Sequence, residues 1–218
     1  MNGIENVYLH LVLDGRDVDP KSAVSYIKII EDKINELGCG KIATISGRYF
    51  AMDRDKRWDR VELAYNTIVC AESEHEFTNP IDYVNSRYEQ GEVDEFIMPA
   101  VNTNVKQKIE DNDSVIFTNF RPDRAMQLAA VLTNENYNPK PEEPIFLPKY
   151  RPNNLSVVQM MKYSDDVKGD IEKALSKAVA GGFNGTHQLS QVVRKTIGSW
   201  VGEEHRRKPM IIPLVVEV

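Results

Sequence analysis

The sequence predicts an α/β protein with a mostly parallel sheet flanked by helices, plus a small C-terminal α/β segment. The first observation is the nearly continuous apolar run from Val7 to Leu13, which is typical of a strand covered on both faces. The second is a helical pattern that follows it and leads into another apolar run at residues 41–46. Strand, helix and strand in this order indicate a parallel unit with a right-handed connection.

The first predicted helix begins at Pro20, because proline is favoured in the first turn of a helix. Its apolar residues recur at helical spacing up to Leu37, and either Gly38 or Gly40 is expected to end it. Further helices are predicted over residues 58–71 and 80–90.

A short strand is predicted over residues 96–101, and we place it at a sheet edge because it contains Pro99. The remaining elements of this part are a buried strand at 114–117, a helix at 125–132 and a strand at 155–163. Residues 139–152 hold five of the eleven prolines and are expected to form an extended connector.

The composition changes near residue 169. From there to the end the chain has 7 Lys/Arg and 5 Asp/Glu, whereas the preceding part has 20 and 28. Helices are predicted at 171–179 and 189–201, and a strand at 210–218. We therefore expect two units, residues 1–168 and residues 169–218.

The overall composition is that of a soluble globular protein, with 41% hydrophobic and 28% charged residues among 218. A net charge of −6 argues against a dedicated nucleic-acid binder. The two cysteines, Cys39 and Cys70, are expected to be free thiols in a reducing compartment. The first residues lack a signal peptide, and no apolar run reaches the roughly 20 residues of a membrane span. The expected location is the cytoplasm, without membrane attachment.

Three charged segments place arginine beside aspartate just after an apolar run. They are L-D-G-R-D at 13–17, G-R-Y-F-A-M-D-R-D-K-R-W-D-R at 47–60, and N-F-R-P-D-R at 119–124. In open α/β sheets ligands bind at the carboxyl ends of the strands, and a guanidinium matches phosphate and carboxylate oxygens bidentately. The segments are therefore expected to converge on one anion, such as a phosphorylated carboxylic acid. The alternative is a set of solvated surface ion pairs, each contributing about 0–1 kcal/mol.

Other kinds of catalytic site find little support. The four histidines are scattered and form no metal-ligand pair; His10, inside a strand, is expected to be simply packed. Neither a glycine-rich phosphate loop after a strand nor a G-x-S-x-G elbow occurs. The residues alone thus predict an anion site without an evident nucleophile, general base or metal cage.

Taken together, the three segments resemble the phosphotransferase domain of cofactor-independent (2,3-bisphosphoglycerate-independent) phosphoglycerate mutases, over roughly residues 7–170. The resemblance implies an isomerase of glycolysis that interconverts 3-phosphoglycerate and 2-phosphoglycerate. It also implies a set of substrate-binding residues: Arg16, Asp17, Arg48, Arg54, Arg121 and Arg124.

The complete family enzyme is expected to use two Mn²⁺ and a nucleophilic serine, carried by a second, phosphatase-like domain. Nothing in this sequence matches those signatures. We therefore expect no catalytic residue, metal ligand or cofactor in this chain, which corresponds to a fragment that is inactive alone.

The last fifty residues, with R-K-T-I-G-S-W-V and R-R-K-P-M-I-I-P-L-V-V-E-V, resemble the C-terminus of the ribonuclease J family over roughly residues 171–218. This resemblance implies an assembly module. The alternative function is thus a non-catalytic interaction or oligomerisation module, with self-association through the apolar C-terminal strand.

Overall fold

The computed structural model describes residues 6–119, 121–137, 146–160 and 163–164. The helices and the strand predicted beyond residue 169 lie outside these residues, as does the first half of the proline-rich connector, residues 139–145. Within the described part, no helix is both long enough and apolar enough to cross a membrane.

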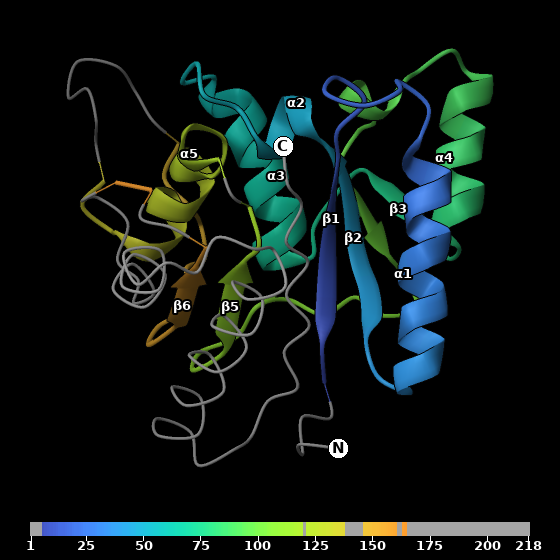
Figure 1. Cartoon of the computed structure of the whole chain (residues 1–218). Helices are drawn as coiled ribbons and strands as arrows, with labels where there is room; N and C mark the ends of the chain where they lie inside the picture. The colour runs from blue at the N-terminus through green and yellow to red at the C-terminus, as the bar shows by residue number, and fades with distance from the viewer. Residues whose placement is uncertain (1–5, 120, 138–145, 161–162, 165–218) are drawn as a thin grey trace, which may run out of the picture.

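The strands form two sheets (Figure 1). The larger sheet is mixed but mostly parallel, and the smaller one is parallel. The larger sheet has the order β1-β2-β4-β3, formed by Tyr8–Leu13, Lys41–Gly47, Ala100–Asn102 and His75–Phe77. β1 is parallel to β2 and β3 is parallel to β4, whereas β4 is antiparallel to β2. The smaller sheet pairs β5 (Ser114–Phe117) with β6 (Ser156–Gln159) in parallel. The predicted fold class is confirmed.

The helices lie on both sides of the larger sheet. They are α1 (Ala23–Leu37), α2 (Arg48–Ala51), α3 (Trp58–Cys70), α4 (Pro80–Glu89), the 3₁₀ helix η1 (Asp94–Phe96) and α5 (Pro122–Thr133). In Figure 1, α1 and α4 cover one side of the sheet, and α3 and α5 lie on the other.

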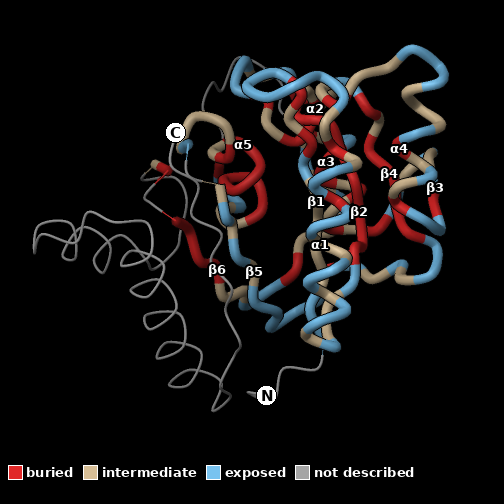
Figure 2. The backbone as a smooth tube through the Cα atoms, turned by 45° about the vertical axis from the view of Figure 1, so that its right-hand side comes forward, coloured by how far each residue is buried: buried red, intermediate tan, exposed pale blue. Residues whose placement is uncertain are grey.

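The two larger apolar cores of the described residues follow from this arrangement. In the first, Ile27 of α1 and Val84 of α4 pack with Ile45 of β2. In the second, Trp58 and Tyr65 of α3 pack with the apolar face of α5. Buried residues accordingly concentrate in β2 and α5, while the outer face of α1 is exposed (Figure 2). Trp58 is therefore a core residue.

Helix α1 ends as the sequence predicts. Gly38 has φ 65°, a left-handed conformation that glycine adopts at little cost, and its N–H donates to the carbonyl oxygen of Ile34. Of the two candidate glycines, Gly38 therefore ends the helix. The helix begins at Ala23, three residues later than Pro20.

The strand predicted at residues 96–101 is wrong in extent and in place. Its first residue belongs to η1, and only Ala100–Asn102 form a strand, which lies inside the sheet between β2 and β3. Pro99 immediately precedes that strand, so its missing N–H removes no bond from the ladder. The strand His75–Phe77 was not predicted, and α5 begins at Pro122 rather than at residue 125.

His10 in β1 gives the first testable prediction. Its Nδ1 lies 2.9 Å from the Thr44 hydroxyl on β2, and burial lowers the pKa of the imidazole to about 4. The unfolded chain keeps a histidine pKa near 6.5, so it takes up a proton first as the pH falls. The contribution of His10 to the free energy of unfolding is therefore fully present above about pH 6.5 and is lost as the pH falls towards 4.

We expect the wild-type chain to lose about 1–3 kcal/mol of unfolding free energy across this window through His10. The lower part of the range reflects the residue's partial solvent access. Urea denaturation at pH 7 and pH 4.5 measures the loss. His10→Leu should reduce it and Thr44→Val, which keeps the imidazole, should not. Equal acid dependence in wild type and His10→Leu would contradict this interpretation.

Candidate functional site

Two of the three charged segments meet because β1 and β2 are parallel neighbours. Leu13 at the end of β1 pairs in register with Gly47 at the end of β2. Residues 14–17 therefore follow β1 at the same edge where Arg48 opens α2. The carboxyl ends of adjacent parallel strands place their loops side by side, as the sequence predicted.

Arg48 is the buried centre of this edge, with only 3% of its side chain exposed. Its Nη1 donates to Asp14 Oδ1 and, at 2.8 Å, to Asp17 Oδ2. Burial alone would lower the pKa of Arg48, but the hydrogen bonds to Asp17 and Asp14 outweigh it and raise the pKa. Arg48 in turn lowers the pKa of Asp17, mainly through their hydrogen bond. Both groups are thus held in their charged forms.

The third segment reaches the same edge through α5. Arg121 Nη1 lies 3.8 Å from Asp17 Oδ2, and its guanidinium contacts Asp123 through two bonds of 3.2 and 3.1 Å. Arg54 Nη1 donates to the same carboxylate, at 3.0 Å from Asp123 Oδ2, the oxygen that also accepts Arg121 Nη2. Asp123 therefore joins the second segment to the third, and hydrogen bonding to Arg121 lowers its pKa.

Arg124 lies in the first turn of α5 rather than in a loop, and it has no carboxylate partner among the ion pairs of the described residues. Its Nη1 donates to the carbonyl oxygen of Met52 at 3.3 Å, and its buried Nε finds no partner in the described part of the chain. Burial first, and then the nearby charges of Arg48 and Arg54, lower its pKa. A bound anion would relieve this repulsion.

Arg16 does not join the cluster. Its side chain is more than half exposed, and Nη1 lies 3.4 Å from Oε1 of Glu95 in η1. In this structure the sequence-predicted residues thus divide into a connected group, formed by Asp17, Arg48, Arg54, Arg121 and Arg124, and a separate Arg16–Glu95 pair.

Several residues of the site were not singled out from the sequence. Asp14 shares Arg48 with Asp17, and the signal for it was present in the L-D-G-R-D segment itself. Arg60 stacks over Tyr49 at 3.7 Å and lies 3.6 Å from buried Asp53. Glu95 and Gln127 are distant in sequence and carry no local signal.

The arrangement is suited to an anion that has more than one charged group. Four guanidiniums, those of Arg48, Arg54, Arg121 and Arg124, face three carboxylates, those of Asp14, Asp17 and Asp123. No group of three or more His, Cys, Asp or Glu side chains is placed to hold a metal ion anywhere in the described residues. The carboxylates present are engaged by arginines, so a pair of divalent cations does not fit here.

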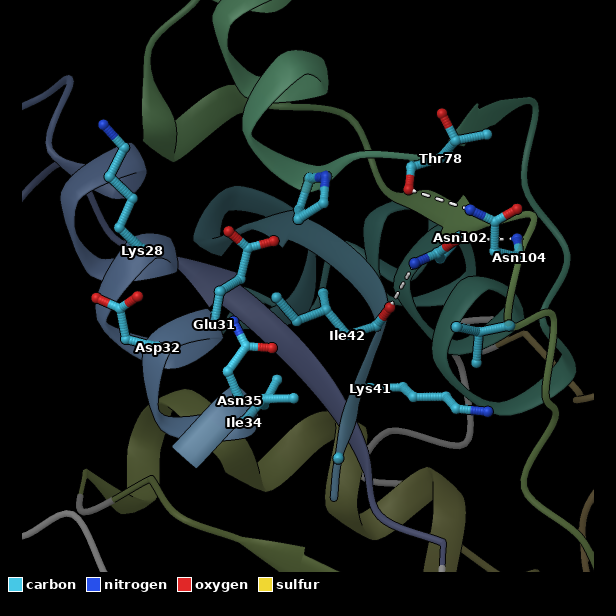
Figure 3. Close-up of a pocket in the computed structure, with 13 residues that line it drawn as sticks. Lys28, Glu31, Asp32, Ile34, Asn35, Lys41, Ile42, Thr78, Asn102 and Asn104 are labelled. Atoms are coloured by element: carbon cyan, nitrogen blue, oxygen red, sulfur yellow. Dashed lines mark hydrogen bonds between the residues drawn. The ribbon is translucent and has the colours of Figure 1, made fainter. Parts of the chain in front are cut away.

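A separate cleft of about 520 Å³ lies at the opposite end of β2 (Figure 3). Lys41 opens β2 there and lines the cleft together with Lys28 of α1 and Asn102 of β4. Since β2 rises about 3.3 Å per residue, the cleft is about 20 Å from the arginine cluster along the strand. It mixes cationic and acidic side chains and takes no part in the cluster.

The fold and the cluster define the class: an α/β domain that gathers arginines at the carboxyl edge of a mostly parallel sheet. The family model described as "BPG-independent PGAM N-terminus" matches residues 1–165. The chain belongs to this family, and the resemblance seen in the sequence is confirmed. A second family model, the ribonuclease J C-terminal domain, matches residues 155–218 and confirms the resemblance of the tail.

Named relatives agree with the family. The chain is 42% identical over 195 residues to the 2,3-bisphosphoglycerate-independent phosphoglycerate mutase of Listeria welshimeri, which covers 87% of this chain and 37% of the relative. It is 46% identical over 169 residues to the mutase of Staphylococcus epidermidis, covering 78% of this chain and 32% of that one. These relatives are phosphoglycerate mutases, an isomerase family, and the chain spans about a third of their length.

A solved structure shows the same fold. The chain superposes on a crystal structure of Leishmania mexicana phosphoglycerate mutase, determined at low cobalt concentration, with a TM-score of 0.62 and 26% identity. The match covers 75% of this chain and 31% of that one.

Proposed function

We propose that this chain holds the phosphorylated substrate of a phosphoglycerate mutase, binding 3-phosphoglycerate and 2-phosphoglycerate through the arginine cluster. The single observation that carries the proposal is the convergence of arginines from three distant segments at one sheet edge. It is sharpest at Arg124, a partly buried guanidinium with no carboxylate partner among the described ion pairs and with a lowered pKa.

Phosphoglycerates supply the complementary groups. A phosphate and a carboxylate separated by a short carbon chain offer two anionic ends, and guanidiniums from the second and third segments meet at Asp123. Asp17, kept ionised by Arg48, would accept a hydrogen bond from the substrate hydroxyl. In this role the chain orients the hydroxyl that receives the phosphoryl group.

The remaining parts of the proposal follow from the family. The serine and the two Mn²⁺ belong to a phosphatase-like domain, so the chain alone is proposed to be inactive. A glycolytic role in the cytoplasm belongs to the same proposal, as does a division of the chain near residue 168. The alternative of self-association through the C-terminal strand concerns residues 210–218, which lie outside the described part of the chain.

Isothermal titration with 3-phosphoglycerate tests the proposal. We expect Arg121→Ala combined with Arg124→Ala to weaken binding at least about 100-fold, because two charge-assisted hydrogen bonds contribute about 1.5–3 kcal/mol each. Lys28→Ala with Lys41→Ala is the matched control, because it removes the same charge from the distant cleft. That control should bind like wild type. A wild-type titration indistinguishable from that of the arginine variant would overturn the proposal.

A further inference from the structure

Asp53 is a buried carboxylate inside the loop that carries Arg54, and only 2% of its side chain is exposed. Its Oδ2 accepts the backbone N–H groups of Asp55 and Arg57, each at 3.0 Å. Arg57 is the residue preceding α3, so this carboxylate closes the loop onto the start of the helix. Arg60 in the first turn of α3 lies 3.6 Å from the other carboxylate oxygen.

Gln127 fastens the same loop to α5. The side chain is almost completely buried, and its Nε2 donates both to the carbonyl oxygen of Asp53 and, at 3.1 Å, to Asp53 Oδ2. On α5, Gln127 lies three residues after Arg124, so the two side chains share one face of the helix. One buried amide thus connects the face that carries Arg124 with the loop that carries Arg54.

Arg54 lies in the loop that this connection joins to α5. The side chain is 45% exposed, and its ion pair in the described structure is the one with Asp123 at the start of α5. Lys56, two residues further, has φ 59°, a left-handed conformation that is costly for a residue with a side chain. A loop with an exposed arginine and an unfavourable backbone angle needs buried bonds to hold one conformation.

We infer that Asp53 and Gln127 are positioning residues that hold Arg54 against α5 for anion binding. The inference rests on the proposed function, because it assigns these residues to the site that binds phosphoglycerate. Neither side chain touches the anion. They act through Arg54, by fixing residues 53–57 relative to Arg121 and Arg124. A helix cap alone would explain the bonds to Asp55 and Arg57, but it would not explain the buried bonds from α5.

The test compares Gln127→Met with Thr67→Val in the full chain. Methionine keeps the length of glutamine and removes its donor. Thr67 is as buried as Gln127, and its hydroxyl lies within hydrogen-bond distance of the carbonyl oxygens of Leu63, within α3, and of Glu72, just beyond the end of α3 that is far from the loop. Its loss therefore controls for general destabilisation. Hydrogen exchange of the Asp55 and Arg57 amides, followed by NMR, reports on the loop without any ligand. We expect exchange about tenfold faster in Gln127→Met and unchanged in Thr67→Val after correction for global stability.

Binding of 3-phosphoglycerate supplies the second readout. We expect Gln127→Met to weaken binding about tenfold. Arg54→Ala should then weaken binding much less in the Gln127→Met variant than it does in the wild-type chain, because both changes act through the same arginine. Additive effects would overturn the positioning role.

The failures of the two proposals are distinguishable. Unchanged amide exchange in Gln127→Met would overturn the inferred connection whether or not the chain binds the ligand. A wild-type chain that does not bind 3-phosphoglycerate would overturn the proposed function. It would also overturn the assignment of these residues to anion binding, even if the amides exchange faster in Gln127→Met.

Discussion

Gly47→Ala is expected to lower the free energy of unfolding by about 3 kcal/mol, the upper part of the range for overpacked sites. A Cβ atom at this position would lie 2.3 Å from the carbonyl oxygen of Glu95 and 2.8 Å from that of Asp94. Both contacts are with backbone, so no side chain can rotate away. Gly47 also donates its N–H to the carbonyl oxygen of Ile97 at 2.8 Å, and relieving the clash would stretch this bond.

The backbone angle of Gly47 does not contribute to this cost. Its φ is −64°, which any residue adopts, so the effect is purely one of contact. Gly91→Ala is the complementary control, because its φ is 88° but nothing lies within 4 Å of the added Cβ. Urea denaturation should show a smaller loss for Gly91→Ala, about 1 kcal/mol. Equal losses in the two variants would contradict the close-contact explanation.

The same contact matters for the site, because η1 packs against the residue that precedes Arg48. If Gly47 is displaced, the buried guanidinium moves relative to Asp14 and Asp17. A 3₁₀ helix about 50 residues away in sequence therefore packs against the backbone from which the central arginine projects.

The sequence predicted those parts of the fold that have a local pattern. The apolar run of β1 and the periodic face of α1 are long enough to specify a strand and a helix, and both occur. The strands β3 and β4 have three residues each, too few for an alternation to be visible. Likewise, η1 has the sequence D-E-F, which has no apolar period, and its position depends on contacts with Gly47 and Gly15.

In the site, too, the sequence predicted what has a local pattern and missed what depends on contacts between distant elements. The pairing of arginine with aspartate after apolar runs predicted that the segments would meet. For the first two segments the reason is that carboxyl ends of parallel strands share an edge. The third follows β5 of the smaller sheet and reaches that edge through the packing of α5, which the pattern did not predict. The choice of partners did not follow from that pattern. Arg16 pairs with Glu95 and Arg60 with Asp53, and these contacts depend on where η1 and α3 pack. The binding role of the predicted residues stays a prediction until it is measured.

Asp94→Ala is expected to lower the free energy of unfolding by about 2–4 kcal/mol, because it leaves several buried groups without an acceptor. The carboxylate accepts the backbone N–H groups of Ser22 and Ala23, each at 2.9 Å, and thereby caps the start of α1 from outside the helix. Its other oxygen accepts the Tyr88 hydroxyl of α4. Asp94 is 1% exposed, so water cannot replace these bonds without rearrangement.

The effect should extend to the arginine cluster. A Cβ atom on Gly15 would lie 2.7 Å from the Asp94 Cβ, so the first charged segment is closely packed on this residue. Asp19→Ala is the matched control, since it removes an exposed acceptor of one backbone N–H, that of Lys21, from the same loop. Thermal or urea denaturation of the three chains measures the difference. If Asp94→Ala were no less stable than Asp19→Ala, the cap provided by η1 would not be what orders the loop between β1 and α1.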